Sequence, residues 1–132
     1  MNWSPRAVLA AAIDVVVVIV FVAIGRRSHD EAGTLSGIAQ TAAPFLIGLG
    51  FAWMVSLGWR RPMSWVTGLI IWPLTVLVGM IVRSQVFDDG TATSFVIVAT
   101  VFLGTFLVGW RLVARVIETR RRRARGARSL TA

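Results

Sequence analysis

Four long apolar segments alternate with short polar segments along this chain. The apolar segments cover residues 7–24, 37–58, 63–82 and 94–113. An α-helix rises about 1.5 Å per residue, so each segment is long enough to cross a hydrocarbon core of about 30 Å. The pattern predicts an all-α, integral membrane four-helix bundle over residues 1–115, followed by a disordered basic tail over residues 116–132.

Polar and turn-forming residues mark the expected helix ends. Trp59-Arg60-Arg61-Pro62 closes the second segment, and Asp88-Asp89-Gly90 precedes the fourth. Pro73 lies in the middle of the third segment and predicts a kink there unless neighbouring groups satisfy the freed carbonyl. The first segment follows Arg6 as a signal peptide would, but its length, its internal acid and the lack of an A-x-A-like cleavage site favour a retained helix.

Composition supports a membrane rather than a soluble fold. Hydrophobic residues make up 56% of the 132 residues, and a soluble domain of this size could not bury so much apolar surface. The sequence has no cysteine, which excludes disulfides, thiolate catalysis and cysteine-based metal sites. We expect no cofactor.

The arginines predict the orientation. With four crossings, eleven arginines fall on the face that carries both termini, and three (Arg26, Arg27 and Arg83) fall on the opposite face. Cytoplasmic loops are enriched in basic residues, so both termini are expected in the cytoplasm, with the protein in the cell (inner or plasma) membrane. The tail arginines supply most of this imbalance.

The tail is also the expected contact with lipid. Its basic run consists of Arg120, Arg121, Arg122, Arg123 and Arg125. Basic residues beside a membrane are attracted to anionic headgroups, so these arginines are candidate anionic-lipid contacts. Nucleic acid is a less favoured partner, because no aromatic or glycine pattern interleaves with the charges.

Asp14 is the main polar anomaly, since it lies in the middle of the first apolar segment. A carboxylate at the centre of a membrane helix costs about 2.5 to 3.5 kcal/mol on insertion scales. One hypothesis is a proton or cation site. The favoured alternative is a structural hydrogen bond to Trp53, to Trp72, to a helix threonine or to an arginine near a helix end. Ala7, Ala10 and Ala11 share its helix side, which predicts that Asp14 faces protein.

A second polar group follows the first helix. Arg26, Arg27 and His29 precede Asp30 and Glu31, and Arg83 is expected at the same face. These residues could form an external anion site, but a solvated helix boundary explains them better. No nucleophile is fixed beside His29, so catalysis and metal binding are disfavoured.

Small residues recur at spacings of four in two of the segments. They are Gly48, Ala52 and Ser56 in the second, and Thr100 and Gly104 in the fourth. Small residues allow helix backbones to approach closely, so these positions predict helix-packing faces. They are also compatible with a homo-oligomer or a membrane partner protein.

Several motifs together resemble a known family. They are Asp14, Ala23-Ile24-Gly25-Arg26-Arg27-Ser28-His29, Pro44-Phe45-Leu46, Trp59-Arg60 with Pro62, Gly68 and Trp72, Gly79-Met80 with Arg83, Gly90-Thr91 with Ser94-Phe95, and Gly109-Trp110-Arg111. Over roughly residues 12–111 the chain resembles the domain of unknown function 3054 family of small actinobacterial membrane proteins. The resemblance implies a four-helix membrane fold and a bacterial inner-membrane location, and it brings no established activity.

Three functions compete on this sequence. The favoured interpretation is an accessory membrane subunit that interacts with lipid or protein, for which the small-residue faces, six tryptophans and basic tail are sufficient. The alternative is a small proton- or ion-coupled transporter subunit that uses Asp14. A membrane enzyme built on His29 ranks last.

Overall fold

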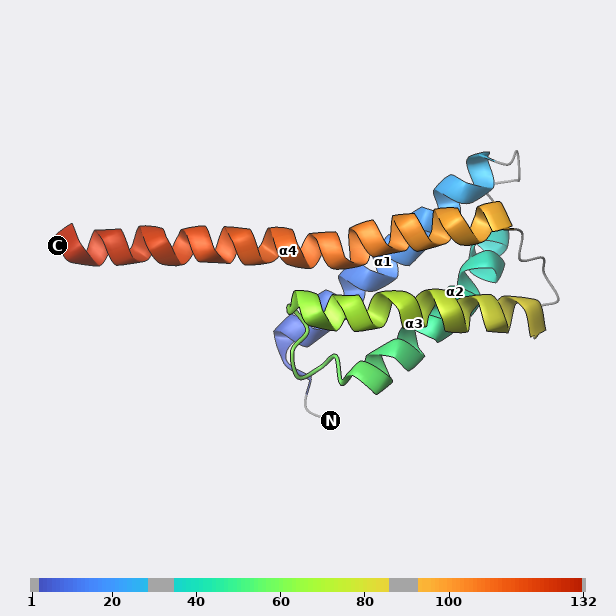
Figure 1. The fold of residues 1–132 in the computed structure, drawn as a ribbon, viewed down its shortest axis with the longest axis horizontal. Coiled ribbons are helices and arrows are strands. Elements are labelled where there is room, and N and C mark those ends of the chain that lie inside the picture. Colours follow the sequence, from blue (N-terminus) through green and yellow to red (C-terminus); the bar gives the residue numbers. More distant parts are fainter. Residues whose placement is uncertain (1–2, 29–34, 86–92, 132) are drawn as a thin grey trace.

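The protein is a bundle of four α-helices (Figure 1). The computed structural model describes residues 3–28, 35–85 and 93–131. The helices are α1 (Pro5–Ser28), α2 (Leu35–Ser56), α3 (Trp65–Gln85) and α4 (Thr93–Thr131). This confirms the predicted all-α class, and each helix is long and apolar enough to cross a bilayer.

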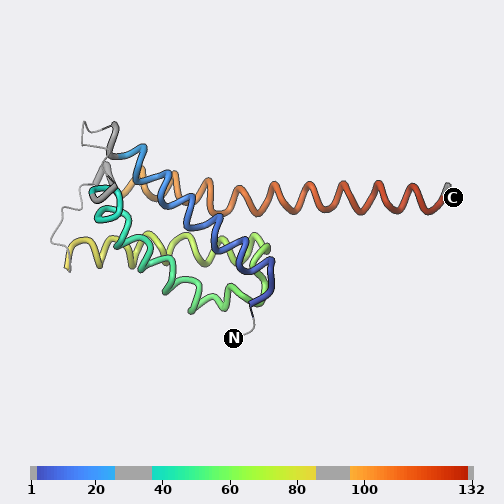
Figure 2. Tube along the Cα trace, turned by 180° about the vertical axis from the view of Figure 1, so that it is seen from behind, coloured from blue at the N-terminus to red at the C-terminus, as the bar shows by residue number. Residues whose placement is uncertain are grey.

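The four helices are arranged as a ring in chain order. Among the described residues, α1 packs against α2, α2 against α3, α3 against α4, and α4 returns to α1. Successive helices run in opposite directions, so α1 and α3 end at the same side of the bundle. The C-terminal half of α4 continues well beyond the other three helices (Figures 1 and 2).

Local sequence explains where α1 begins and α2 ends. The Ser4 hydroxyl accepts a hydrogen bond from the backbone N–H of Ala7 at 3.1 Å, an N-cap, and Pro5 fills the first helical position, where no N–H is needed. At the C-terminal end of α2, Leu57 takes a left-handed conformation with φ of 53°. The N–H of Gly58 donates a hydrogen bond to the Trp53 carbonyl at 3.0 Å. This C-cap turns the chain back toward α3.

The closest helix contact joins α2 and α3. A Cβ added to Gly48 would lie 2.8 Å from the Thr75 carbonyl oxygen and 2.9 Å from the Gly79 nitrogen. The two backbones therefore touch at paired glycines. Gly48 and the neighbouring Ala52 are buried, which confirms this part of the predicted packing face.

A buried stripe on α1 faces the centre of the ring. Ala7, Ala10, Asp14 and Val18 are all 0% exposed and recur every three or four residues. The predicted inward orientation of Asp14 is therefore confirmed. Large apolar side chains on the opposite sides of the helices point outward.

The end of the chain differs from the expected disordered tail, because α4 runs unbroken to Thr131. Extending an existing helix avoids the unfavourable nucleation step, and arginine and alanine are strong helix formers. Glu118 accepts a hydrogen bond from Arg122 at 3.0 Å, a stabilising pair four residues apart. The α3 helix likewise continues through Pro73.

The glycine contact yields a test with a matched control. We expect Gly48→Ala to lower the free energy of unfolding by about 1–3 kcal/mol, because the added methyl group overlaps the α3 backbone. Gly50→Ala, two residues away, meets open space and should be neutral or slightly stabilising. Unfolding of the purified protein in detergent, followed by circular dichroism, measures both. Equal stability of the two variants would contradict the close approach.

Candidate functional site

The Asp14 carboxylate is enclosed by donors from two other helices. One oxygen, Oδ1, accepts hydrogen bonds from Trp110 Nε1 at 2.9 Å and from an Arg111 terminal nitrogen, Nη1, at 3.0 Å. The other, Oδ2, accepts from Trp53 Nε1 at 2.9 Å and from Arg111 Nη2 at 2.7 Å. The guanidinium therefore binds the carboxylate in a bidentate manner, the strongest geometry for this pair.

Arg111 is as buried as its partner, with a side chain 0% exposed. Its remaining contacts are also polar: Nε donates to the Pro62 carbonyl at 2.9 Å, and Nη1 also donates to the Leu107 carbonyl at 2.8 Å. The guanidinium carbon lies 4.5 Å from the centre of the Trp110 ring, within cation–π range. Both charges are thus paired and hydrogen-bonded, the condition under which buried charges are tolerated.

All four helices shape this cluster. Asp14 comes from α1, Trp53 from α2, and Trp110 and Arg111 from α4. The α3 helix contributes space, because a Cβ on Gly68 would lie 3.0 Å from Arg111 Cδ. Even a methyl group at this position would press against the Arg111 side chain and, at 3.2 Å, the Leu107 carbonyl oxygen.

The turn after α2 fixes the position of Trp53. Gly58 packs on the Trp53 ring so closely that an added Cβ would lie 2.5 Å from a ring carbon. Trp53 also stacks against Trp3, with ring centres 5.2 Å apart. Trp53 is only 4% exposed, so its indole N–H is held toward Asp14 in a fixed orientation.

The chemistry of the cluster is that of an ion pair. Every group facing the two Asp14 oxygens is an N–H donor, a set that matches a carboxylate rather than a neutral acid.

Within residues 3–28, 35–85 and 93–131, no group of three or more His, Cys, Asp or Glu could hold a metal ion.

The other predicted site residues are not brought to this cluster. Arg26 and Arg27 belong to the last turn of α1, and Arg83 is half-buried in the last turn of α3. His29 lies outside the described residues. The basic run is exposed on α4; its members are Arg120, Arg121, Arg122, Arg123 and Arg125.

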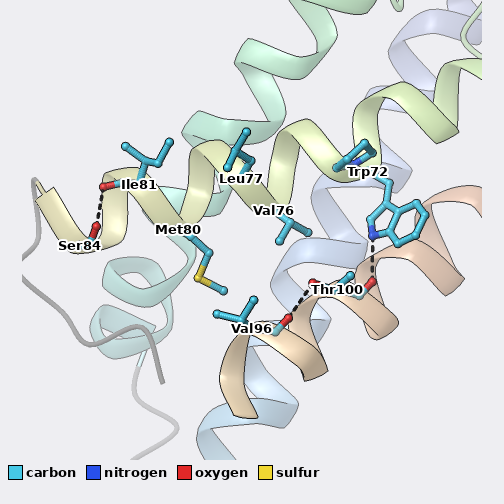
Figure 3. A pocket seen from close by; sticks show the side chains of 9 residues that line it. Trp72, Val76, Leu77, Met80, Ile81, Ser84, Val96 and Thr100 are labelled. Atoms are coloured by element: carbon cyan, nitrogen blue, oxygen red, sulfur yellow. Dashed lines mark hydrogen bonds between the residues drawn. The ribbon is translucent and has the colours of Figure 1, made fainter. Parts of the chain in front are cut away.

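Trp72, one of the partners considered for Asp14, bonds elsewhere. Its Nε1 donates to the Thr100 carbonyl at 2.8 Å, beside a groove of about 610 Å³ between α3 and α4 (Figure 3). The Thr100 hydroxyl donates to the Val96 carbonyl, and the Ser84 hydroxyl donates to the Ile81 carbonyl. The polar groups at this groove are therefore engaged with the backbone, and its lining is otherwise apolar.

Arg111 and Trp110 are the partners that sequence reasoning did not assign to Asp14. Arg111 was grouped with the arginines at the cytoplasmic end of the fourth segment. A signal was present, because Leu112, Val113, Val116 and Ile117 continue the apolar pattern past Arg111. The arginine therefore lies inside an apolar stretch, where a charged partner is expected.

The fold and the cluster define a class of small four-helix proteins with helices apolar enough to cross a membrane and a buried ion pair that joins the first and last helix. The chain belongs to the family of proteins of unknown function DUF3054, whose family model matches residues 11–114. The match includes both Asp14 and Arg111 and confirms the resemblance seen in the sequence. Neither a curated protein nor a solved structure matched the chain.

A double-mutant cycle tests the ion pair. We expect Asp14→Leu and Arg111→Met each to lower the free energy of unfolding by about 3–5 kcal/mol, because each leaves one buried charge without its partner. The double variant, Asp14→Leu with Arg111→Met, should lose much less unfolding free energy than the two single variants lose together. Unfolding in detergent under identical conditions gives all three values.

The matched control for this cycle is Arg115→Met, one helical turn further along α4. Arg115 is exposed, so its replacement should change the free energy of unfolding by no more than about 0.5 kcal/mol. Strictly additive losses in the cycle would show that the two residues act independently and would contradict the ion pair.

Proposed function

We propose that the protein is a multi-pass membrane protein that works as a non-catalytic accessory subunit, through contacts with anionic lipid and with neighbouring proteins. The observation that carries this proposal is the closed Asp14–Arg111 cluster. The intramembrane acid is fully used in holding α1, α2 and α4 together, which leaves the surfaces of the bundle to make interactions.

Outward-facing side chains support insertion into a bilayer. Each helix exposes large apolar residues, for example Val16 at 56%, Met54 at 66%, Leu77 at 58% and Val101 at 62%. Exposed apolar surface on every side of a small bundle is unfavourable in water, and a hydrocarbon solvent removes that penalty. The apolar side chains of α4 continue as far as Ile117.

The arginine distribution supports cytoplasmic termini. Because Arg111 is buried in the bundle, it no longer counts as a flanking charge. Ten arginines then remain at the end that carries the termini, namely Arg6, Arg60, Arg61 and the seven after residue 114, against three at the other end. The imbalance still satisfies the positive-inside rule.

The helical form of the basic run supports contact with the membrane surface. Arg120 to Arg123 follow Ile117, where the continuous apolar stretch of α4 ends, by about 5 to 9 Å along the helix. This distance is comparable to the screening length of about 8 Å at physiological ionic strength. Four consecutive residues of a helix point to all sides, so a tilt of α4 in any direction brings arginines toward anionic headgroups.

The alternative of proton-coupled transport finds less support in this geometry. A coupling acid must exchange its partners during the transport cycle, whereas Asp14 is held by four donors from two other helices. Releasing it would break contacts to α2 and α4 together. The accessory role needs no such rearrangement.

Orientation is tested with single cysteines, because the chain has none of its own. We expect a thiol introduced by Asp89→Cys, between α3 and α4, to react with an impermeant maleimide added outside intact spheroplasts. A thiol introduced by Ser129→Cys, near the end of α4, should react only after permeabilisation. The reverse labelling pattern would show that the orientation is inverted. Labelling of both thiols from outside would contradict a membrane crossing by α4, and with it the four crossings.

Lipid contact by α4 is tested with a nitroxide label on the Ser129→Cys protein in nanodiscs. We expect slower label motion with about one third phosphatidylglycerol than with phosphatidylcholine alone, and the difference should vanish in about 1 M salt, where the screening length falls to about 3 Å.

The control for this measurement replaces the five arginines of the basic run, Arg120 to Arg123 and Arg125, by glutamine. Glutamine preserves the length and helix propensity of the side chains and removes their charge. The label should then move equally fast in both lipids. Slowing that persists in this variant would rule out the arginines as the lipid contact.

A further inference from the structure

A groove of about 430 Å³ opens between α1 and α2, at the end of the bundle where the chain begins. Trp3, Trp53 and Trp59 line one part of it, and Val15 and Leu46 are among the apolar residues that line the rest. Trp3 stacks on Trp53, and its ring centre lies 6.4 Å from that of Trp59. The site is an apolar trough that ends in an aromatic cluster.

The trough is open above Gly50. Gly50 lines the groove, and a Cβ placed on it would meet nothing within 4 Å. From Leu46 to Trp53 the helix rises about 10 Å, so the groove accepts an elongated apolar group lying along α2. Tryptophans at one end are typical of the boundary between hydrocarbon and headgroups.

Exposed arginines lie close in sequence to the tryptophans of the aromatic end. Arg60 and Arg61 directly follow Trp59 and are exposed, and neither is paired with a carboxylate of the described chain. Arg6, three residues after Trp3, has a side chain 69% exposed and a long 3.9 Å contact to Glu118. Such an exposed pair contributes little, so Arg6 remains able to attract an anion.

We infer that the groove between α1 and α2 is a binding site for one anionic glycerophospholipid. An acyl chain lies in the trough over Gly50, the glycerol region packs against the tryptophans, and the phosphate is held by Arg60 and Arg61. This inference rests on the proposed membrane location. The larger groove between α3 and α4 has no such aromatic cluster: among the described residues that line it Trp72 is the only tryptophan, and the polar groups beside it bond the backbone (Figure 3).

Native mass spectrometry of the full-length protein in detergent tests the site. The probes are phosphatidylglycerol and phosphatidylcholine with identical acyl chains, titrated separately. We expect the first phosphatidylglycerol to bind at least about fivefold more tightly than phosphatidylcholine, the preference that one basic residue at a membrane surface supplies. Equal affinities would overturn the inference.

The groove and the charges are tested by separate variants. Gly50→Leu should weaken binding of the first lipid of either kind by about tenfold, equivalent to about two methylene groups lost from the trough. It fills open space and raises helix propensity, so the fold is retained. Arg60→Gln with Arg61→Gln should reduce phosphatidylglycerol binding to about the phosphatidylcholine level. Phosphatidylcholine binding should weaken less, because its choline cation offsets the charge of its phosphate.

Two controls separate this site from other lipid contacts. Gly109→Leu, at an open position on α4, and glutamine replacement of the five-arginine run should both keep the affinity of wild type. The site would be overturned if Gly50→Leu bound lipid as tightly as wild type, or if Gly109→Leu lost as much lipid affinity as Gly50→Leu. It would also be overturned if the protein formed a lipid-free dimer that Gly50→Leu abolished, because the groove would then be a contact between two copies. Failure of the membrane topology is detected independently, by the cysteine labelling pattern.

Discussion

The paired burial of Asp14 and Arg111 is the constraint on which the rest of the structure depends. Two opposite charges are fully enclosed, and breaking such a pair costs several kcal/mol because one charge is left without compensation. The pair therefore selects arrangements in which α1 and α4 lie side by side in a single register. The Pro62 carbonyl adds the turn between α2 and α3 to the same centre.

Packing elsewhere in the bundle is consistent with this register. Gly68 leaves room for the arginine side chain, and the paired glycines Gly48 and Gly79 bring α3 against α2. The Trp53 indole N–H is hydrogen-bonded to the carboxylate, and the Trp53 ring stacks on Trp3. In a hydrocarbon solvent, apolar burial drives helix association only weakly, so close backbone contact and satisfied polar groups must supply the specificity.

The difference between the interior and the periphery of the bundle underlies the proposed function. The polar interior stabilises a scaffold, and interaction falls to the periphery: the basic extension of α4, and the trough beside Gly50 with Arg60 and Arg61 at its end. Under the proposed function, these peripheral surfaces would recognise lipid and neighbouring membrane proteins by shape and charge. Its buried acid acts by positioning helices.

The sequence alone determined the number of helices, their approximate bounds, the family and the inward direction of Asp14, because these follow from hydrophobic periodicity and local motifs. It also narrowed the partners of Asp14 to a set that included Trp53 and an arginine near a helix end. Only the tertiary structure selected Arg111 and Trp110, which lie 97 and 96 residues away, because such pairing depends on which helix ends meet in space. The tertiary structure likewise decided the helical form of the C-terminal residues. The first half of α4 is packed in the bundle, and it supplies the nucleus from which the helix extends through the charged residues.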